Sequence, residues 1–204
     1  MLRSKHYGIG LALAAVFASS GCSGGDAGKS DTGMAVSDTG AMMGDTGMAM
    51  APMPAAAMSD ANIVYVLDQS NLLDSVSGAI AATKGTNSEV REFARMMMRD
   101  HHALRRDGQA LAKKLAVTPA APGGDNSKAE SDRVMSMLNN AAKGRDFDKA
   151  YIDDQVTYHV NLLATATSVM AAAQNPELKN FIQKAAPTVQ AHLDRVQAIQ
   201  RTLQ

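Results

Sequence analysis

Apolar residues recur every three or four positions over four long stretches in the C-terminal two thirds of the chain, which is the period of helices that bury one face. These stretches cover residues 60–84, 88–116, 146–174 and 176–203. A shorter stretch of the same period covers residues 130–142, after the helix-breaking run TPAAPGGDNS. The pattern predicts an all-α fold for residues 59–204: a four-helix bundle with a short extra helix in the connection between helices two and three.

Capping residues support these boundaries. Ser59 or Asp60 precedes the first helix and Gly85 follows it, Ser88 stands at the start of the second, and Asn175 followed by proline stands at the start of the fourth. The long helices are therefore predicted to form two pairs, each joined by a tight turn.

Two adjacent histidines lie in the middle of the second predicted helix, and a helix directs neighbouring side chains to different faces. His101 falls on the apolar stripe between Met97 and Leu104, whereas His102 shares its face with Arg105. We therefore expect His101 to point inward and His102 to be a solvated surface residue.

Each of the four long helices has one potential metal ligand on its apolar stripe: Asp74, His101, His159 and His192. Asp74 and His101 lie about 12 and 14 residues from the turn between them, and His159 and His192 about 15 and 17 residues from theirs. A helix rises about 1.5 Å per residue, so the partners in each pair differ by only about 3 Å in height. The four side chains are predicted to meet near mid-bundle.

Three histidines and one carboxylate would suit Zn, Cu or Fe, with Gln155 and Tyr158 as outer partners. The alternative is structural: buried histidines are often core residues that hydrogen-bond to a neighbour, and Asp74 could pair with one imidazolium. Burying four polar groups together is costly without a satisfying partner, which favours a bound metal.

The first residues have the features of an export signal, with Arg3 and Lys5 before an apolar run that is too short to span a membrane. The following SSGCSGG resembles the lipobox of bacterial lipoproteins, although Ser19 stands where Leu or Val is usual. Residues 1–21 are thus predicted to be a lipoprotein-type signal peptide and Cys22 the lipidated residue, with ordinary cleavage near residues 18–21 as the alternative. Ser23 resembles the sorting pattern for outer-membrane anchoring. The expected location is the periplasmic face of the bacterial envelope, with the membrane as a partner through the lipid.

Residues 22–58 lack large apolar residues other than methionine and are predicted to be a disordered Met/Gly/Ala-rich tether. DTG recurs there at Asp31, Asp38 and Asp45, and the segment holds half of the chain's 14 methionines. Methionine thioethers prefer Cu(I), so copper capture is an alternative to a simple spacer.

Charge and motifs exclude several other functions. Lys plus Arg equals Asp plus Glu at 20 each, with no basic stripe, so nucleic-acid binding has no support. The chain has neither a Gly-rich phosphate loop nor a GxSxG elbow, and its single cysteine cannot form a CxxC pair.

The chain resembles the family called domain of unknown function 4142. The matching motifs are Asp74 with Gly78 and Ala81, EVREFA at 89–94, Asp100 with His101, FDKAYI at 147–152 with His159, and NPELKNF at 175–181 with Pro187 and His192. Asp74 stands where the family usually has Glu, one methylene longer. The resemblance implies an envelope protein with a ferritin-like four-helix bundle.

Di-iron proteins of the ferritin-like class carry a Glu-x-x-His pair on each of two helices. The matching positions here are Met98-x-x-His101 and Val189-x-x-His192, so ferritin-type ferroxidase chemistry is not expected. No general acid or base could be nominated, which favours a binding protein over an enzyme. We expect a tethered bundle that binds a transition metal, in envelope stress or metal handling; the alternative is a structural or interaction lipoprotein without metal, whose protein partner is unknown.

Overall fold

The computed structural model describes residues 58–204, so the predictions for the signal peptide, Cys22 and the tether up to residue 57 lie outside the described residues. Met58, the last residue assigned to the tether, is buried at 8% exposure. The described residues contain five helices and no strand, which confirms the all-α prediction. The helices are α1 (Asp60–Lys84), α2 (Ser88–Lys114), α3 (Ser127–Asn140), α4 (Arg145–Ala172) and α5 (Pro176–Thr202).

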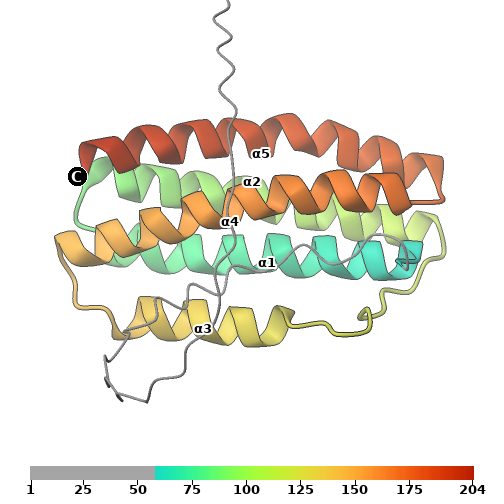
Figure 1. Cartoon of the computed structure of the whole chain (residues 1–204), viewed down its shortest axis with the longest axis horizontal. Helices are drawn as coiled ribbons and strands as arrows, with labels where there is room; N and C mark the ends of the chain where they lie inside the picture. Colours follow the sequence, from blue (N-terminus) through green and yellow to red (C-terminus); the bar gives the residue numbers. More distant parts are fainter. Residues whose placement is uncertain (1–57) are drawn as a thin grey trace, which may run out of the picture. The chain divides into compact units, whose positions relative to one another are not determined.

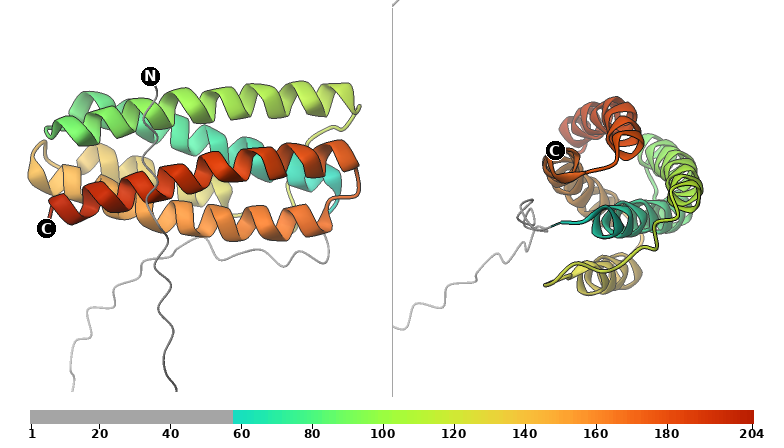
Figure 2. Two further views of the ribbon diagram at one scale, coloured as in Figure 1. Left: turned by 90° about the horizontal axis from the view of Figure 1, so that it is seen from above. Right: turned by 90° about the vertical axis from the view of Figure 1, so that its right-hand side faces the viewer.

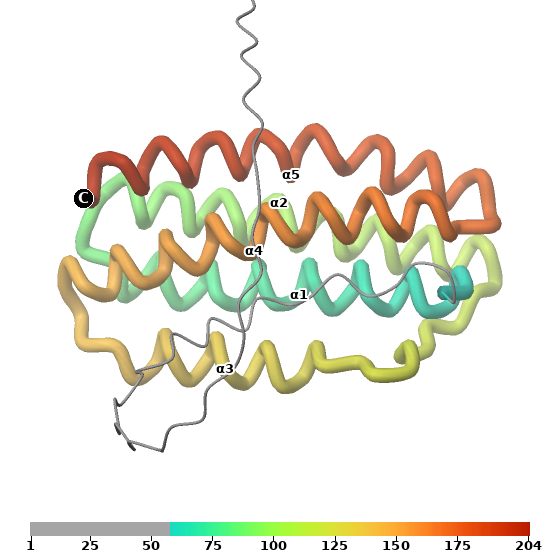
Figure 3. Tube along the Cα trace, viewed as in Figure 1, coloured from blue at the N-terminus to red at the C-terminus, as the bar shows by residue number. Residues whose placement is uncertain are grey.

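The helices form a bundle of two antiparallel hairpins, α1 with α2 and α4 with α5 (Figures 1 and 3). Seen along the helix axes, these four helices surround a common centre, and α3 lies outside them against α1 (Figure 2). The connection between the hairpins, which contains α3, runs back along the bundle, so α4 runs in the same direction as α2 (Figure 1). None of the helices in residues 58–204 has the length and hydropathy needed to cross a membrane.

Buried apolar side chains form two clusters. One includes Phe93, Tyr151 and Ile199 and lies toward the turn between α1 and α2. The other includes Ile63 and Leu178 and lies toward the turn between α4 and α5. The bundle is therefore apolar toward both ends, and its buried histidines belong to the middle of the helices.

Two aspartates connect the hairpins, each at the first turn of one helix. Asp148 at the start of α4 accepts hydrogen bonds from the backbone N–H groups of Thr86 and Asn87, both at 2.8 Å, and from the Thr86 hydroxyl. Asp60 at the start of α1 accepts from the N–H groups of Gln174 and Asn175, at 2.8 and 3.0 Å. Each carboxylate thus accepts hydrogen bonds from backbone N–H groups in the turn of the opposite hairpin. These contacts set the axial register between the two pairs of helices.

The helix caps differ slightly from those predicted. The N-cap of α2 is Asn87, whose side chain accepts from Glu89 N and Val90 N, and Ser88 is the first helical residue. Ser59 caps α1 in a capping box with Asn62, and Asn175 caps α5 as expected.

The α1 and α2 backbones approach closely at Gly78. A Cβ atom there would lie 2.7 Å from the carbonyl oxygen of Ala94 and 3.0 Å from the amide nitrogen of Met98. Glycine is therefore required for this packing. Asp74 lies one turn before Gly78 on α1, and His101 lies three residues after Met98 on α2. The close approach thus brings both side chains to the same interface.

We expect Gly78→Ala to lower the free energy of unfolding by about 1–3 kcal/mol, because the added methyl overpacks the contact between the α1 and α2 backbones. Gly108→Ala is the matched control: its Cβ would meet only the Phe181 ring at 3.5 Å, an ordinary contact, and the change should add up to about 1 kcal/mol of helix stability. Urea titration of the metal-free protein, followed by circular dichroism, measures both. Equal effects of the two changes would contradict the close approach.

Asp148→Asn should lower the free energy of unfolding by about 1–3 kcal/mol, since an amide group replaces one acceptor oxygen by a donor that faces backbone N–H groups. Asp146→Asn, in the same turn of α4 but exposed, should change it by less than about 0.5 kcal/mol. Thermal unfolding by calorimetry compares them. If both variants unfold like the unchanged protein, Asp148 does not hold the turn.

Candidate metal centre

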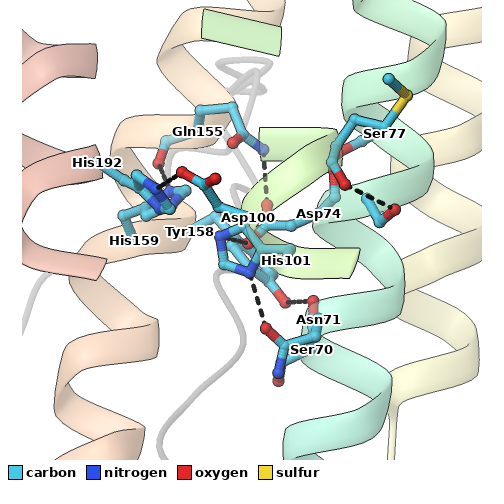
Figure 4. Close-up of polar contacts among 12 residues, drawn as sticks. Ser70, Asn71, Asp74, Ser77, Asp100, His101, Gln155, Tyr158, His159 and His192 are labelled. Atoms are coloured by element: carbon cyan, nitrogen blue, oxygen red, sulfur yellow. Dashed lines mark hydrogen bonds and ion pairs between the residues drawn. The ribbon is translucent and has the colours of Figure 1, made fainter. Parts of the chain in front are cut away.

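Three histidine rings meet in the middle of the bundle, one each from α2, α4 and α5 (Figure 4). His101 and His159 are fully buried and His192 is 2% exposed. The ring centroids are 5.1 Å apart for His101 and His192, 5.7 Å for His101 and His159, and 5.6 Å for His159 and His192. One potential ligand nitrogen from each ring lies within 4.8 Å of the other two. The convergence expected from helix heights is therefore found.

The two adjacent histidines lie on different faces of α2, as the apolar stripe predicted. His101 is buried and His102 is exposed. Neighbouring residues of a helix point in different directions, and α2 packs only one face against α1 and α5.

The outer nitrogen of His101 is bound by a neighbouring amide. Its Nδ1 lies 2.9 Å from Oδ1 of Asn71, and Nδ2 of Asn71 donates to the carbonyl oxygen of Leu67 at 2.7 Å. The Asn71 oxygen is thus the acceptor, and Nδ1 of His101 carries the proton. The lone pair of His101 is consequently on Nε2, the nitrogen nearer Asp74.

The other two rings are oriented in the same manner. Nδ1 of His159 lies 2.9 Å from the carbonyl oxygen of Gln155, one turn earlier in α4. Nε2 of His192 lies 3.1 Å from Oδ2 of Asp100 on α2. Both partners are acceptors, so each ring donates outward and keeps its lone pair on the other nitrogen.

The three inner nitrogens have no hydrogen-bond partner. Nε2 of His101, Nε2 of His159 and Nδ1 of His192 are all buried and unsatisfied, and so is Oδ2 of Asp74. These four atoms belong to the four residues predicted from the sequence. Each of the three nitrogens has only a lone pair to offer, so none of them can satisfy another; the three together require a cation or hydrogen-bond donors.

Asp74 lies beside His101 and is fully buried. Its Oδ2 is 3.3 Å from Nε2 of His101, and its Oδ1 accepts from Nε2 of Gln155 at 3.2 Å. Burial raises the pKa of Asp74 well above the ordinary value of 3.8, against the smaller effect of the Gln155 hydrogen bond. Asp74 is therefore a neutral carboxylic acid when no cation is near, and its one proton can serve only one of the three nitrogens, Nε2 of His101.

Burial also keeps the three imidazoles neutral. It lowers the pKa of His101 well below the ordinary value of 6.5, lowers that of His159 to about 4, and lowers that of His192, for which the hydrogen bond to Asp100 acts in the opposite direction. Neutral imidazole is the form that coordinates metal ions.

Asp100 remains a carboxylate. Burial by itself would raise its pKa, but hydrogen bonds from Arg99 and His192 outweigh this and lower it below the ordinary value. A carboxylate behind an imidazole is the arrangement that orients histidine ligands and raises their basicity in metalloproteins.

Asn71 and Asp100 belong to the site as well, although the sequence pattern did not indicate them. Asp100 lies off the apolar stripe of α2, and only the packing of α5 brings His192 to it. Asn71 lies one turn before Asp74 on α1, so its helical spacing was the available signal. Of the two outer partners that were predicted, Gln155 contacts Asp74, whereas the hydroxyl of Tyr158 donates to the carbonyl oxygen of Ser70 at 3.1 Å.

The described chain is thus a helical bundle with a buried polar centre. A comparison with protein families matches residues 45–199 to the family described as Domain of unknown function (DUF4142), and the chain belongs to this family. No curated protein matches the chain, and no solved structure does.

His159→Leu tests the cost of the unpaired nitrogens in the metal-free protein. At pH 7 the variant should unfold with a free energy equal to that of the unchanged protein or up to about 1 kcal/mol higher, because an orphaned polar atom is replaced by a similar apolar volume. At pH 5 the variant should be more stable by about 2 kcal/mol, since an unfolded histidine binds a proton below pH 6.5 and the folded one does so only near pH 4. Urea titrations at the two pH values decide; a loss of more than about 2 kcal/mol at pH 7 would mean that the ring is a structural element.

Proposed function

We propose that this protein binds one transition-metal ion at the centre of its bundle through His101, His159 and His192, with Asp74 as the adjacent carboxylate. The observation that carries the proposal is the set of three buried imidazole nitrogens with inward lone pairs and no donor among them. Their outward hydrogen bonds leave them unable to rotate toward another partner without losing one. A cation is the partner that satisfies all three at once.

The distances are compatible with a transition metal. A Zn–N bond of about 2.0–2.1 Å in tetrahedral geometry separates two ligand nitrogens by about 3.4 Å. One potential ligand nitrogen of each ring lies within 4.8 Å of the other two, so closure around an ion requires movements of roughly 1 Å. Asp74 Oδ2 borders the same space and could occupy the fourth position or accept a hydrogen bond from a bound water.

Three neutral nitrogen ligands with one carboxylate suit Zn, Cu or Fe, as the sequence analysis expected. Each ring has an oxygen acceptor behind it, from an amide side chain, a backbone carbonyl or a carboxylate. Such partners fix the tautomer before the metal arrives and so reduce the cost of organising the site.

We further propose that the bundle is of the ferritin-like type. The long return connection containing α3, which makes α4 parallel to α2, is the connectivity with one crossover that this class uses (Figure 1). The missing Glu-x-x-His pairs separate it from the di-iron members.

The proposed setting is the bacterial envelope. Export with lipidation at Cys22 and a tether over residues 22–58 would hold the bundle on the periplasmic side of the outer membrane, with the membrane as partner. We identify no general acid or base at the buried centre, which favours metal binding over catalysis. The role that we propose is metal handling or protection in envelope stress.

Elemental analysis of the full chain tests the metal proposal. The protein is produced by export, purified without chelator or added histidine tag, and analysed as isolated and after separate loading with Zn, Cu and Fe. About one equivalent of metal should remain after dialysis, as for other sites with three histidine ligands.

Two substitutions of histidine by leucine provide the matched comparison. His159→Leu should weaken metal affinity by more than about 100-fold, because loss of an outer partner alone costs about 10–100-fold. His102→Leu, on the exposed face of α2, should leave it unchanged. Asp100→Asn should fall between them. Absence of retained metal under every loading, or equal retention by His159→Leu, would refute the proposal.

A further inference from the structure

Helix α4 has a second apolar stripe beside the one that carries His159. The inward stripe includes Ile152, His159 and Val169, which are all buried. The second stripe lies about a quarter turn around the helix from it, and its spacings alternate between four and three residues, as on a helix face that packs against another helix. We call it the flank stripe, and its members are Val156, Val160, Leu163, Thr167 and Met170.

The flank stripe is only partly covered within the bundle. Val160 is 48% exposed and Met170 is 37% exposed. Between the stripe and α5 runs a groove of about 250 Å³, whose α5 side consists of Ile182, Ala186 and Gln190. Among residues 58–204, no helix lies over this side of α4, whereas α3 covers the outer side of α1 (Figure 2).

The surface around the flank stripe has no charge along most of α4. Residues 155–174 contain no Lys, Arg, Asp or Glu, and a helix of this length extends over about 30 Å. The exposed face of α2 is different, since it carries Glu92, Arg95, Arg99, Arg106 and Lys113. A solvated helix face is normally polar and charged, so an uncharged one with exposed apolar side chains indicates a contact surface.

The absence of charge from residues 155–174 restricts the partner. A helix that lies on a lipid surface carries Lys and Arg on its polar face, where they meet the headgroups, and this part of α4 has neither. A charged protein surface would lose hydration here without gaining a countercharge. A second copy of the chain has the matching surface, because a two-fold contact places like residues near one another and an uncharged face does so without repulsion.

We propose that the flank stripe and the adjoining groove form a symmetric dimer interface, in which α4 of one copy packs antiparallel to α4 of a second copy. A two-fold axis near Leu163 places Val160 of each copy at the height of Thr167 of the other, where the groove is. The exposed valine of each copy thus enters the groove of the other.

The available area is sufficient for such a dimer. A face about 30 Å long and two helices wide, with each helix about 10 Å across, covers about 600 Å² on each copy. The total of about 1,200 Å² is at the lower end of specific interfaces, so we expect a dissociation constant of about 1–100 µM. The dimer does not require the metal site, and metal-free protein can be used to test it.

Analytical ultracentrifugation over a range of protein concentrations measures the association. The chain that follows the predicted signal peptide, residues 22–204, carries Cys22→Ser in every variant, so that neither a lipid nor a disulfide joins two copies. Val160→Glu should raise the dissociation constant by more than about 100-fold, because the symmetric contact brings two carboxylates together. Val76→Glu is the matched control, since Val76 is 40% exposed on α1, and should leave it unchanged.

Oxidation of methionine by hydrogen peroxide locates the interface independently. Met170 on α4 and Met98 on α2 are equally accessible in one copy, at 37% and 39% exposure. At concentrations where the dimer is formed, Met170 should oxidise several-fold more slowly than in dilute protein, whereas the rate at Met98 should stay the same. Mass spectrometry of the peptides gives both rates.

A single-chain mass up to about 500 µM would overturn the proposal, as would equal effects of the two glutamate substitutions. A dimer in which Met170 reacts as fast as in dilute protein would place the interface elsewhere and overturn it too. Slow oxidation of Met170 that persists in monomeric Val160→Glu would assign the flank stripe to a segment of the same chain. Protection that arises only on adding vesicles of phosphatidylethanolamine and phosphatidylglycerol would assign it to a lipid surface, and either result would refute the dimer.

Discussion

The geometry of the centre depends on the axial register of the two hairpins. Asp148 and Asp60 each accept backbone hydrogen bonds from the turn of the opposite hairpin, one at each end of the bundle. Since a slip of a single residue would shift a helix by about 1.5 Å, and of one turn by about 5.4 Å, these contacts at the two ends determine whether the rings meet. Apolar packing alone tolerates more variation in register than a cluster of three ring nitrogens does.

Given that register, the centre places polar atoms where the rest of the core is apolar. Each imidazole donates outward to a fixed acceptor, and its remaining lone pair faces two others across a space from which water is largely excluded. Burial lowers the histidine pKa values and raises that of Asp74, so the group is neutral rather than ionic. An arrangement that costs stability in the metal-free protein is typical of a binding site, where the ligand supplies the missing interaction.

The two sides of the histidine centre are packed differently. Small residues in α5, such as Ala185 and Ala186, and the half-buried face of α2 leave space on one side of the rings, whereas large residues such as Phe93 and Tyr151 fill the other side. Large side chains thus fill the space toward the α1–α2 turn, and a pocket lined by no histidine lies toward the α4–α5 turn.

Periodicity and helix rise were sufficient to predict the five helices, the inward position of His101, the outward position of His102 and the common height of the four inward polar residues, because these follow from local backbone geometry. The roles of Asn71 and Asp100 and the aspartate contacts to the turns required the tertiary structure. Asp100 shows the reason: it lies off its own helix's apolar stripe, and its partner His192 is 92 residues away. A period in the sequence specifies which face of a helix is buried, but the angle and separation of two helices come from side-chain packing across the interface, and these decide which atoms meet.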